Sequence, residues 1–171
     1  PAISLIDMLL SMPIIDPDLG CYGAEGKKPE GVVPTVLVSA VALIDADDRV
    51  LLAKRLQGKA MEGLWEFPGG KVEKNETPET ALVRELAEEL NIDITESCLA
   101  PLTFASHIYK KNKKGEKSFH LLMPLFVCRV WKGMVRANEG QELKWSNPLE
   151  IKTDEMPAAD IPLVAVLRDW L

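Results

Sequence analysis

Cysteine is scarce in this chain of 171 residues, which holds only Cys21, Cys98 and Cys128. The three are widely spaced and form no C-x-x-C pair. An odd number without paired spacing excludes the disulfide framework of a small secreted domain. We therefore expect reduced and mostly buried thiols, which favours a cytosolic compartment.

Long apolar runs and an excess of positive charge are also missing. No stretch approaches the ~20 apolar residues that a membrane span requires. No Lys or Arg precedes Lys27, so the basic n-region of a secretory signal and the arginines of a transit peptide are absent. With 26 acidic against 20 basic residues and a net charge of -6, the chain is poorly suited to gripping a nucleic-acid backbone. We expect a soluble, cytoplasmic protein with no membrane or nucleic-acid partner, and leave protein partners open.

The residues that are present predict one globular domain behind an N-terminal extension. The composition is 47% hydrophobic and 27% charged, enough to bury a core, which excludes a disordered chain. Residues 1–33 carry turn and linker signals such as Asp16-Pro17-Asp18. Their apolar residues around 3–10 are compatible with a short helix, docked or flexible. The main domain is expected over 34–171, a normal length for one domain.

Apolar periodicity predicts a mixture of strands with two helices. Two β-branched runs separated by Asp45-Ala46-Asp47-Asp48 indicate a hairpin, and a short strand runs into a glycine turn at Gly69-Gly70. Mixed strands with two helices on a sheet indicate an α/β sandwich. The expected strands are 36–44, 49–55, 63–67, 100–109, 119–130 (after a polar loop at 110–117) and 143–145, and the expected helices are 78–90 and 161–171.

The helix expected over 78–90 carries a concentrated acidic face. Thr77 is a good N-cap and Pro78 suits the first helical position. At 100° per residue, Glu85, Glu88 and Glu89 fall within an arc of roughly 100°, away from the apolar side. Such a face is either simply solvated or a site for a hard cation such as Mg²⁺ or Mn²⁺. The helix alone does not decide between the two.

The residues around this helix form a longer pattern. Gly70 is followed after five residues by Glu76 and after seven more by Arg84-Glu85-Leu86-Ala87-Glu88-Glu89-Leu90-Asn91-Ile92. This resembles the signature of the Nudix hydrolases, Gly-x5-Glu-x7-Arg-Glu-(apolar)-x-Glu-Glu-x-Gly-(apolar). Asn91 stands where the family has Gly. We expect a left-handed conformation there, which Asn tolerates best among the other residues.

The resemblance extends to the MutT-type branch of that family, through 63–73, Glu139-Gly140-Gln141, Trp145 and 157–162. It implies a Nudix-type α/β/α sandwich with a mixed β-sheet and a strand-loop-helix-loop signature. Members of the branch typically convert a nucleoside triphosphate to a monophosphate and pyrophosphate. The leading hypothesis is therefore a Mg²⁺-dependent hydrolase of an oxidised purine nucleotide such as 8-oxo-dGTP, with a role in nucleotide-pool sanitation. A (d)CTP or modified-cytosine nucleotide pyrophosphatase and a non-catalytic nucleotide-sensing Nudix module are the alternatives.

The resemblance also assigns expected roles to individual residues. Arg84 is expected to orient Glu85, with Glu76 in support. Either Glu85 or Glu139 is the candidate base. Mg²⁺, with Mn²⁺ as a substitute, is expected on Glu85, Glu88, Glu89, Glu139 and a carbonyl of Gly69 or Gly70.

Substrate contacts are expected from a second set of residues. Lys71 and Arg55 are candidate phosphate contacts, and Phe67 and the weaker candidate Phe119 lie near the base. Asp160 matches a base-reading Asn of the branch, and it is equally compatible with capping the last helix. The two histidines, His107 and His120, and the tryptophans Trp65, Trp131 and Trp145 are interpreted as structural.

Overall fold

The computed structural model describes residues 33–110 and 118–171. The expected extension and its apolar helix, most of the polar loop at 110–117, and Cys21 lie outside the described residues. The strands are β1 (Thr35–Leu43), β2 (Val50–Lys54), β3 (Trp65–Glu66), β4 (Gly69–Lys71), β5 (Ala100–Tyr109), β6 (Phe119–Cys128) and β7 (Leu143–Ser146). The helices are α2 (Pro78–Leu90) and α3 (Ile161–Trp170), with short 3-10 turns η1 (Glu96–Cys98), η2 (Pro148–Glu150) and η3 (Thr153–Glu155).

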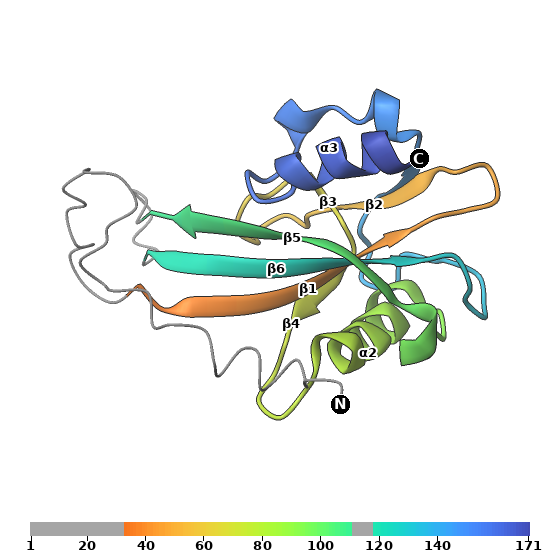
Figure 1. Ribbon diagram of the computed structural model, residues 1–171, viewed down its shortest axis with the longest axis horizontal. Coiled ribbons are helices and arrows are strands. Elements are labelled where there is room, and N and C mark those ends of the chain that lie inside the picture. Colours follow the sequence, from red (N-terminus) through yellow and green to blue (C-terminus); the bar gives the residue numbers. More distant parts are fainter. Residues whose placement is uncertain (1–32, 111–117) are drawn as a thin grey trace, which may run out of the picture. The chain divides into compact units, whose positions relative to one another are not determined.

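The strands form two sheets (Figure 1). One has four strands in the order β4-β1-β6-β5, and the other has three in the order β3-β2-β7. β1 and β6 run parallel, whereas every other neighbouring pair is antiparallel. The mixed sheet predicted from the sequence is therefore confirmed, and the helices occupy the two spans predicted for them.

The predicted hairpin between 36–44 and 49–55 is wrong in its pairing. β1 pairs with β4 and β6, while β2 pairs with β3 and β7, so the two strands lie in different sheets. In the described part of the chain, the pairing between the two segments is limited to the bridge between Ile44 and Val50 and the adjoining bond from the Asp45 N–H to the Arg49 carbonyl oxygen. The Asp45 carboxylate accepts hydrogen bonds from the backbone N–H groups of Asp47 and Arg49, which redirects the chain after β1. The expected glycine turn is likewise a strand, since Gly69 and Gly70 belong to β4.

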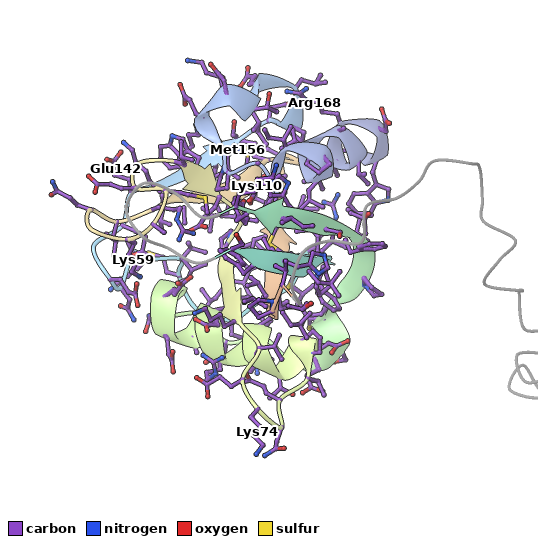
Figure 2. All side chains as sticks on the ribbon, turned by 90° about the vertical axis from the view of Figure 1, so that its left-hand side faces the viewer. Lys59, Lys74, Lys110, Glu142, Met156 and Arg168 are labelled. Carbon is purple, nitrogen blue, oxygen red and sulfur yellow. The ribbon has the colours of Figure 1, made fainter. Side chains whose placement is uncertain are left out.

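The two helices cover opposite faces of the four-stranded sheet (Figure 1). Val41 and Leu43 of β1 pack against α2, whereas Ala40 and Ala42 face the core that includes α3. The α3 side also holds the segment around Met156, which lies with Arg168 in one outer layer (Figure 2). This alternation follows from the two-residue period of a strand, and it confirms the α/β/α sandwich.

The ends of α2 are set by capping residues that were predicted from the sequence. The Thr77 hydroxyl accepts the backbone N–H of Thr80 at 3.1 Å, and Pro78 begins the helix. Asn91 ends it in a left-handed conformation, with φ 55° and ψ 41°, as predicted. Its buried residues are Ala81, Leu82, Leu86 and Leu90. The helix therefore buries its apolar side, while on its acidic side Glu88 is exposed and Glu85 and Glu89 are half-buried.

Several residues without an assigned function have structural surroundings. His120 lies between Thr35 and Ser106, at 3.2 and 2.8 Å from their hydroxyl oxygens. Trp131 and Trp145 stack at 6.1 Å beside the α2 core. In residues 33–110 and 118–171, no helix is long and apolar enough to cross a membrane.

Candidate active site

The carboxylates of α2 are ordered by Arg84. Its guanidinium donates to both carboxylate oxygens of Glu76, at 2.9 and 3.0 Å, and to Glu85 at 2.8 Å. These bonds, first to Glu76 and then to Glu85, raise the pKa of Arg84 above its ordinary value. They also lower the pKa of Glu76, which in turn accepts the backbone N–H of Glu73. The expectation that Arg84 orients Glu85 agrees with this geometry.

The two glycines of β4 allow the helix and the sheet to approach closely. A Cβ atom on Gly70 would lie 2.1 Å from Oε1 of Glu85, so that carboxylate occupies the space a side chain would need. Gly69 has φ +146°, and a Cβ atom there would lie 2.1 Å from the backbone oxygen of Ser39. A side chain at position 69 would therefore clash with the backbone of β1, whereas a side chain at position 70 would displace the carboxylate of Glu85.

The loop between β6 and β7 forms hydrogen bonds with the C-terminal end of α2 through its residues 138–141. The side-chain amides of Asn138 and Gln141 donate to the carbonyl oxygens of Glu88 and Glu89, at 3.0 and 2.9 Å. The side-chain oxygen of Gln141, Oε1, also accepts a hydrogen bond from the backbone N–H of Glu139, at 3.0 Å. Since the last carbonyls of a helix lack intrahelical partners, this loop satisfies them. It thereby places Glu139 beside the acidic helix, although 50 residues separate Glu139 from Glu89 in the chain.

We define the carboxylate cluster as Glu85, Glu88, Glu89 and Glu139. Burial raises the pKa of Glu89 to about 7, and repulsion from the carboxylates of Glu85, Glu139 and Glu66 adds to this shift. Glu88, by contrast, has a side chain that is 62% exposed. Clustered acidic oxygens are the donor set that a hard divalent cation prefers. The residues therefore fit such an ion, although the described residues hold no three acidic, His or Cys side chains arranged as a metal site.

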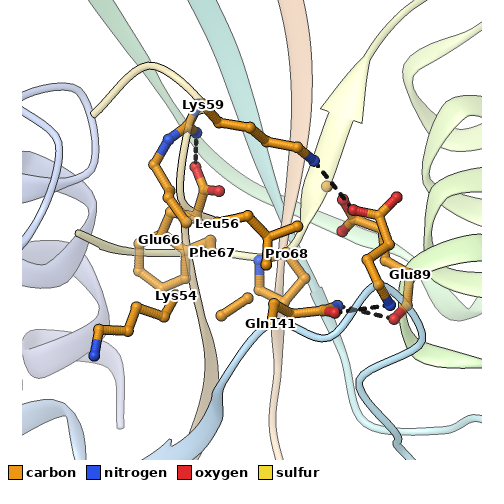
Figure 3. A pocket seen from close by; sticks show the side chains of 12 residues that line it. Lys54, Leu56, Lys59, Glu66, Phe67, Pro68, Glu89 and Gln141 are labelled. Atoms are coloured by element: carbon orange, nitrogen blue, oxygen red, sulfur yellow. Dashed lines mark hydrogen bonds and ion pairs between the residues drawn. The ribbon is translucent and has the colours of Figure 1, made fainter. Parts of the chain in front are cut away.

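A cavity of about 420 Å³ leads from the carboxylate cluster into the molecule. Glu89 lines one part of it and Asp160 another, and three cationic side chains, Arg55, Lys59 and Lys71, lie along it. An adjoining pocket shares Lys59, Phe67 and Glu89 with this cavity, and Figure 3 shows the Lys59 side chain extending above Phe67 and Pro68 there. The Lys59 ammonium lies 3.1 Å from the Glu139 carboxylate. The cavity thus joins acidic and basic groups in one continuous space.

Arg55 is held by groups that the sequence did not single out. Its guanidinium pairs with the carboxylate of Glu66, and its Nε donates to the carbonyl oxygen of Ala60 at 2.6 Å. Burial raises the pKa of Glu66, while the charge of Arg55 opposes that rise. Because its guanidinium carries more donors than these bonds use, Arg55 has further N–H groups that face the cavity it lines.

Asp160 is buried at the inner part of the cavity, with only 5% of its surface exposed. Its carboxylate accepts the backbone N–H of Phe67 at 3.2 Å, and it makes no side-chain cap to α3. Asp160 thus stands at the N-cap position of α3, as the sequence allowed, but its side chain does not make the capping hydrogen bond. Burial raises the pKa of Asp160 to about 7, although the bond from Phe67 opposes the shift. Near neutral pH this carboxyl is accordingly shared between a donor form and an acceptor form.

A second cavity, of about 330 Å³, adjoins Asp160 and is mainly apolar. We call it the apolar pocket, with Phe119, Tyr109, Met61, Leu121 and Asp160 among its lining residues. Phe119 stacks on Tyr109 with ring centroids 5.1 Å apart, and the Tyr109 hydroxyl accepts the backbone N–H of Ala159. Phe67 itself is buried in the core next to the pocket. Flat aromatic and apolar walls of this kind suit a nucleobase.

The structure brings together most of the predicted site residues. It adds Glu66, Lys59, Tyr109, Asn138 and Gln141, which the sequence reasoning did not assign to the site. Gln141 stands in the Glu139-Gly140-Gln141 motif, so a signal for it was present. The other four come from segments whose patterns are also typical of ordinary surface or core positions.

Comparison with known proteins identifies the family. Residues 33–167 match the family model of the NUDIX domain. The chain belongs to the Nudix family. It is 38% identical over 123 residues to the CTP pyrophosphohydrolase of Escherichia coli K12, covering 72% of this chain and 84% of that protein. It is 31% identical over 130 residues to the 8-oxo-dGTP diphosphatase of the same organism, covering 75% of this chain and 94% of that protein.

A solved structure agrees with this assignment. The MutT NUDIX hydrolase of Burkholderia pseudomallei aligns with a TM-score of 0.64 and 28% identity, over 78% of this chain and 96% of that one. The resemblance to the MutT-type branch is thereby confirmed, as is the expectation of a Nudix pyrophosphohydrolase acting on nucleotides. Members of this family generally use divalent metal ions, which agrees with the donor set of the carboxylate cluster.

Proposed function

We propose that this Nudix enzyme hydrolyses a nucleoside triphosphate to a monophosphate and pyrophosphate, with 8-oxo-dGTP as its preferred substrate. The observation that carries the proposal is one cavity lined by Glu89, by the cationic side chains of Arg55, Lys59 and Lys71, and by the buried Asp160. Its part at Glu89 offers acidic ligands for a metal ion, the cations can bind phosphates, and the part around Asp160 adjoins an apolar space. A metal-bound nucleoside triphosphate carries a group to match each of these parts.

In this proposal each end of the cavity has a separate task. Glu85 or Glu139 takes a proton from the attacking water, and Arg84 keeps Glu85 in the orientation for that transfer. Mg²⁺, with Mn²⁺ as a substitute, held by the carboxylate cluster and a carbonyl of Gly69 or Gly70, would draw charge from the phosphates. Arg55, Lys59 and Lys71 bind the phosphate chain. Attack of the water oxygen on phosphorus breaks the phosphoanhydride bridge between the α- and β-phosphates, and the products are the monophosphate and pyrophosphate.

Asp160 and the apolar pocket are assigned to the base. As a neutral acid, Asp160 donates to a purine carbonyl oxygen, and as a carboxylate it accepts from an N–H or an amine. Phe119, Phe67 and Tyr109 supply apolar and aromatic surface around it. An 8-oxo-guanine presents both kinds of group along its edges. The branch relatives named as 8-oxo-dGTP diphosphatases support this substrate.

A cytosine nucleotide is the second candidate, supported by a specific observation. The chain is 38% identical to a protein named CTP pyrophosphohydrolase, a value above that for the E. coli 8-oxo-dGTP diphosphatase. The exocyclic amine and ring nitrogen of cytosine can also pair with Asp160 in its two protonation forms. A non-catalytic sensing module is disfavoured, because every carboxylate of the signature is present.

The test is a Mg²⁺-dependent hydrolysis assay with 8-oxo-dGTP, dGTP, dCTP, 5-methyl-dCTP and a dinucleoside polyphosphate, identifying both products. We expect the highest kcat/KM for 8-oxo-dGTP, with monophosphate and pyrophosphate released. A preference for the cytosine nucleotides would transfer the proposal to the second candidate. No turnover of any of them by metal-loaded protein would favour the sensing module.

A further inference from the structure

One buried hydroxyl near the site has no role in the proposed reaction. Ser39 of β1 is 0% exposed, and its Oγ is the one buried side-chain oxygen or nitrogen of residues 33–110 and 118–171 without a hydrogen-bond partner. An unpaired buried hydroxyl costs stability, roughly 1–3 kcal/mol, and an alanine at this position would avoid that cost. Such a group in a folded protein calls for an explanation.

The strand register places Ser39 on the face that meets α2. Ser39 lies directly opposite Gly70 in the antiparallel pairing of β1 with β4. Paired residues project their side chains to the same face, with Cβ positions about 4.5–5.5 Å apart. Val41 and Leu43, two and four residues further along β1, pack in the same cluster as α2. The Ser39 side chain therefore projects under α2, beside the position of Gly70.

The carboxylate of Glu85 fills the space above Gly70. The Cβ position of Gly70 lies 2.1 Å from Oε1 and 2.7 Å from Oε2 of Glu85. Arg84 donates to Oε1 from the outer side, at 2.8 Å. Ser39, which pairs with Gly70, lies on the sheet side of this carboxylate. Because its Oγ has no partner in the structure, a change of the Ser39 or Glu85 rotamer is needed to form a hydrogen bond between the two.

We propose that Ser39 is a positioning residue for Glu85, and that after such a rotamer change its hydroxyl donates to the Glu85 carboxylate from the sheet side. Arg84 holds the carboxylate from the helix side, so the two donors together fix its orientation. The inference rests on the proposed function, in which Glu85 acts in catalysis. It explains why a polar residue occupies a buried strand position where an apolar one would be more stable.

The test compares three substitutions at Ser39, assayed with the best substrate of the nucleotide panel. Ser39→Ala removes the hydroxyl, Ser39→Cys keeps its size with a weaker donor, and Ser39→Thr keeps the hydroxyl. We expect Ser39→Ala and Ser39→Cys to lower kcat about tenfold, the effect of one hydrogen bond to a charged group, with KM changed less than about twofold. Ser39→Thr should restore at least about half of the parent kcat, and the melting temperature of Ser39→Ala should equal or exceed that of the parent.

Two further measurements separate positioning from packing. In a Glu85→Ala background, Ser39→Ala should lower the residual kcat less than about twofold, because the group it positions is gone. Ser146→Ala, which removes another buried strand serine away from the cavity, should leave kcat unchanged.

The inference is overturned if Ser39→Ala keeps kcat within about twofold of the parent, or if the loss persists undiminished with Glu85→Ala. A loss of kcat that Thr does not restore, together with a lower melting temperature, overturns it as well. A parent protein that hydrolyses no nucleotide removes the proposed function and this inference together. An active parent with an unaffected Ser39→Ala variant removes the inference alone.

Discussion

The two ends of the cavity differ in what surrounds most of their carboxyl groups. At the carboxylate cluster, Arg84 binds Glu76 and Glu85, and Glu88 is largely exposed. At the apolar pocket, Asp160 is buried and its main partner is one backbone N–H. Glu89 is the exception at the first end, because burial and repulsion from neighbouring carboxylates raise its pKa to about 7, as burial does for Asp160 at the second. Charged partners and solvent favour ionised carboxylates, whereas burial favours the neutral acid. The first end is thus suited to binding cations, and the second to pairing with a neutral base.

The largest expected effect comes from removing one charge at the carboxylate cluster. Glu88→Gln should lower kcat by about 10³-fold, because the ligand set loses a charged oxygen. The melting temperature should stay equal or rise, since repulsion from Glu85 and Glu89 is relieved. Activity assays and thermal denaturation check both expectations. Glu79→Gln, on the same helix but outside the cluster, is the control, and full turnover by Glu88→Gln would contradict the metal assignment.

Substitutions at the two adjacent glycines of β4 are expected to separate an effect on activity from an effect on stability. Gly70→Ala should lower kcat by about 10²-fold with little loss of stability, because its Cβ displaces the flexible carboxylate of Glu85. Gly69→Ala should instead destabilise the fold by about 3 kcal/mol or more, because its Cβ meets the backbone of Ser39 at an unfavourable φ. Denaturant unfolding and kcat measured on both variants test this. Equal destabilisation by the two substitutions would contradict it.

Asp160→Asn addresses the apolar pocket. We expect it to change the ratio of kcat/KM between guanine and cytosine nucleotides about tenfold, with less effect on the best rate, because it alters the hydrogen-bonding edge. The nucleotide panel measures this ratio. If the parent and the variant rank the nucleotides identically, Asp160 does not read the base.

The same substitution has a pH signature in stability. The pKa of Asp160 is about 7 in the folded protein, above its ordinary value of 3.8, so the folded state keeps a proton that the unfolded state has lost. Its contribution to stability is therefore greatest below about pH 4 and declines as the pH rises through about 7. Asp160→Asn should raise the melting temperature relative to the parent more at pH 8 than at pH 5. An equal difference at both pH values would contradict the burial argument.

The smallest effect is expected between the two ends, at Lys59. Its ion pair with Glu139 is exposed on both sides and contributes little stability. Lys59→Gln should raise KM about two- to fivefold with kcat nearly unchanged, because it removes a cation from the phosphate path. Lys152→Gln, which breaks a surface pair with Glu155 outside the cavity, serves as the control. A change confined to kcat would argue instead that Lys59 acts through Glu139.

The sequence by itself determined the elements whose causes are local. The span of α2, its Thr77 cap and the left-handed Asn91 follow from residues within a few positions of one another. The acidic face of α2 follows from the helical period, and the family from the spacing between Gly70 and Ile92. These features needed no knowledge of distant contacts.

Only the tertiary structure decided what depends on distant partners. The pairing of β1 with β6 instead of β2, the bond from Phe67 to Asp160 and the tie from Gln141 to Glu89 join residues far apart in the chain. The sequence around Asp160 is equally compatible with a helix-capping side chain. Its burial and its place in the lining of the cavity appear only in the tertiary structure. Ser39 likewise has no distinguishing feature in the sequence, and only the strand register pairs it with Gly70, whose Cβ position meets the Glu85 carboxylate. Burial and long-range contacts set these chemical environments, and a linear pattern does not contain them.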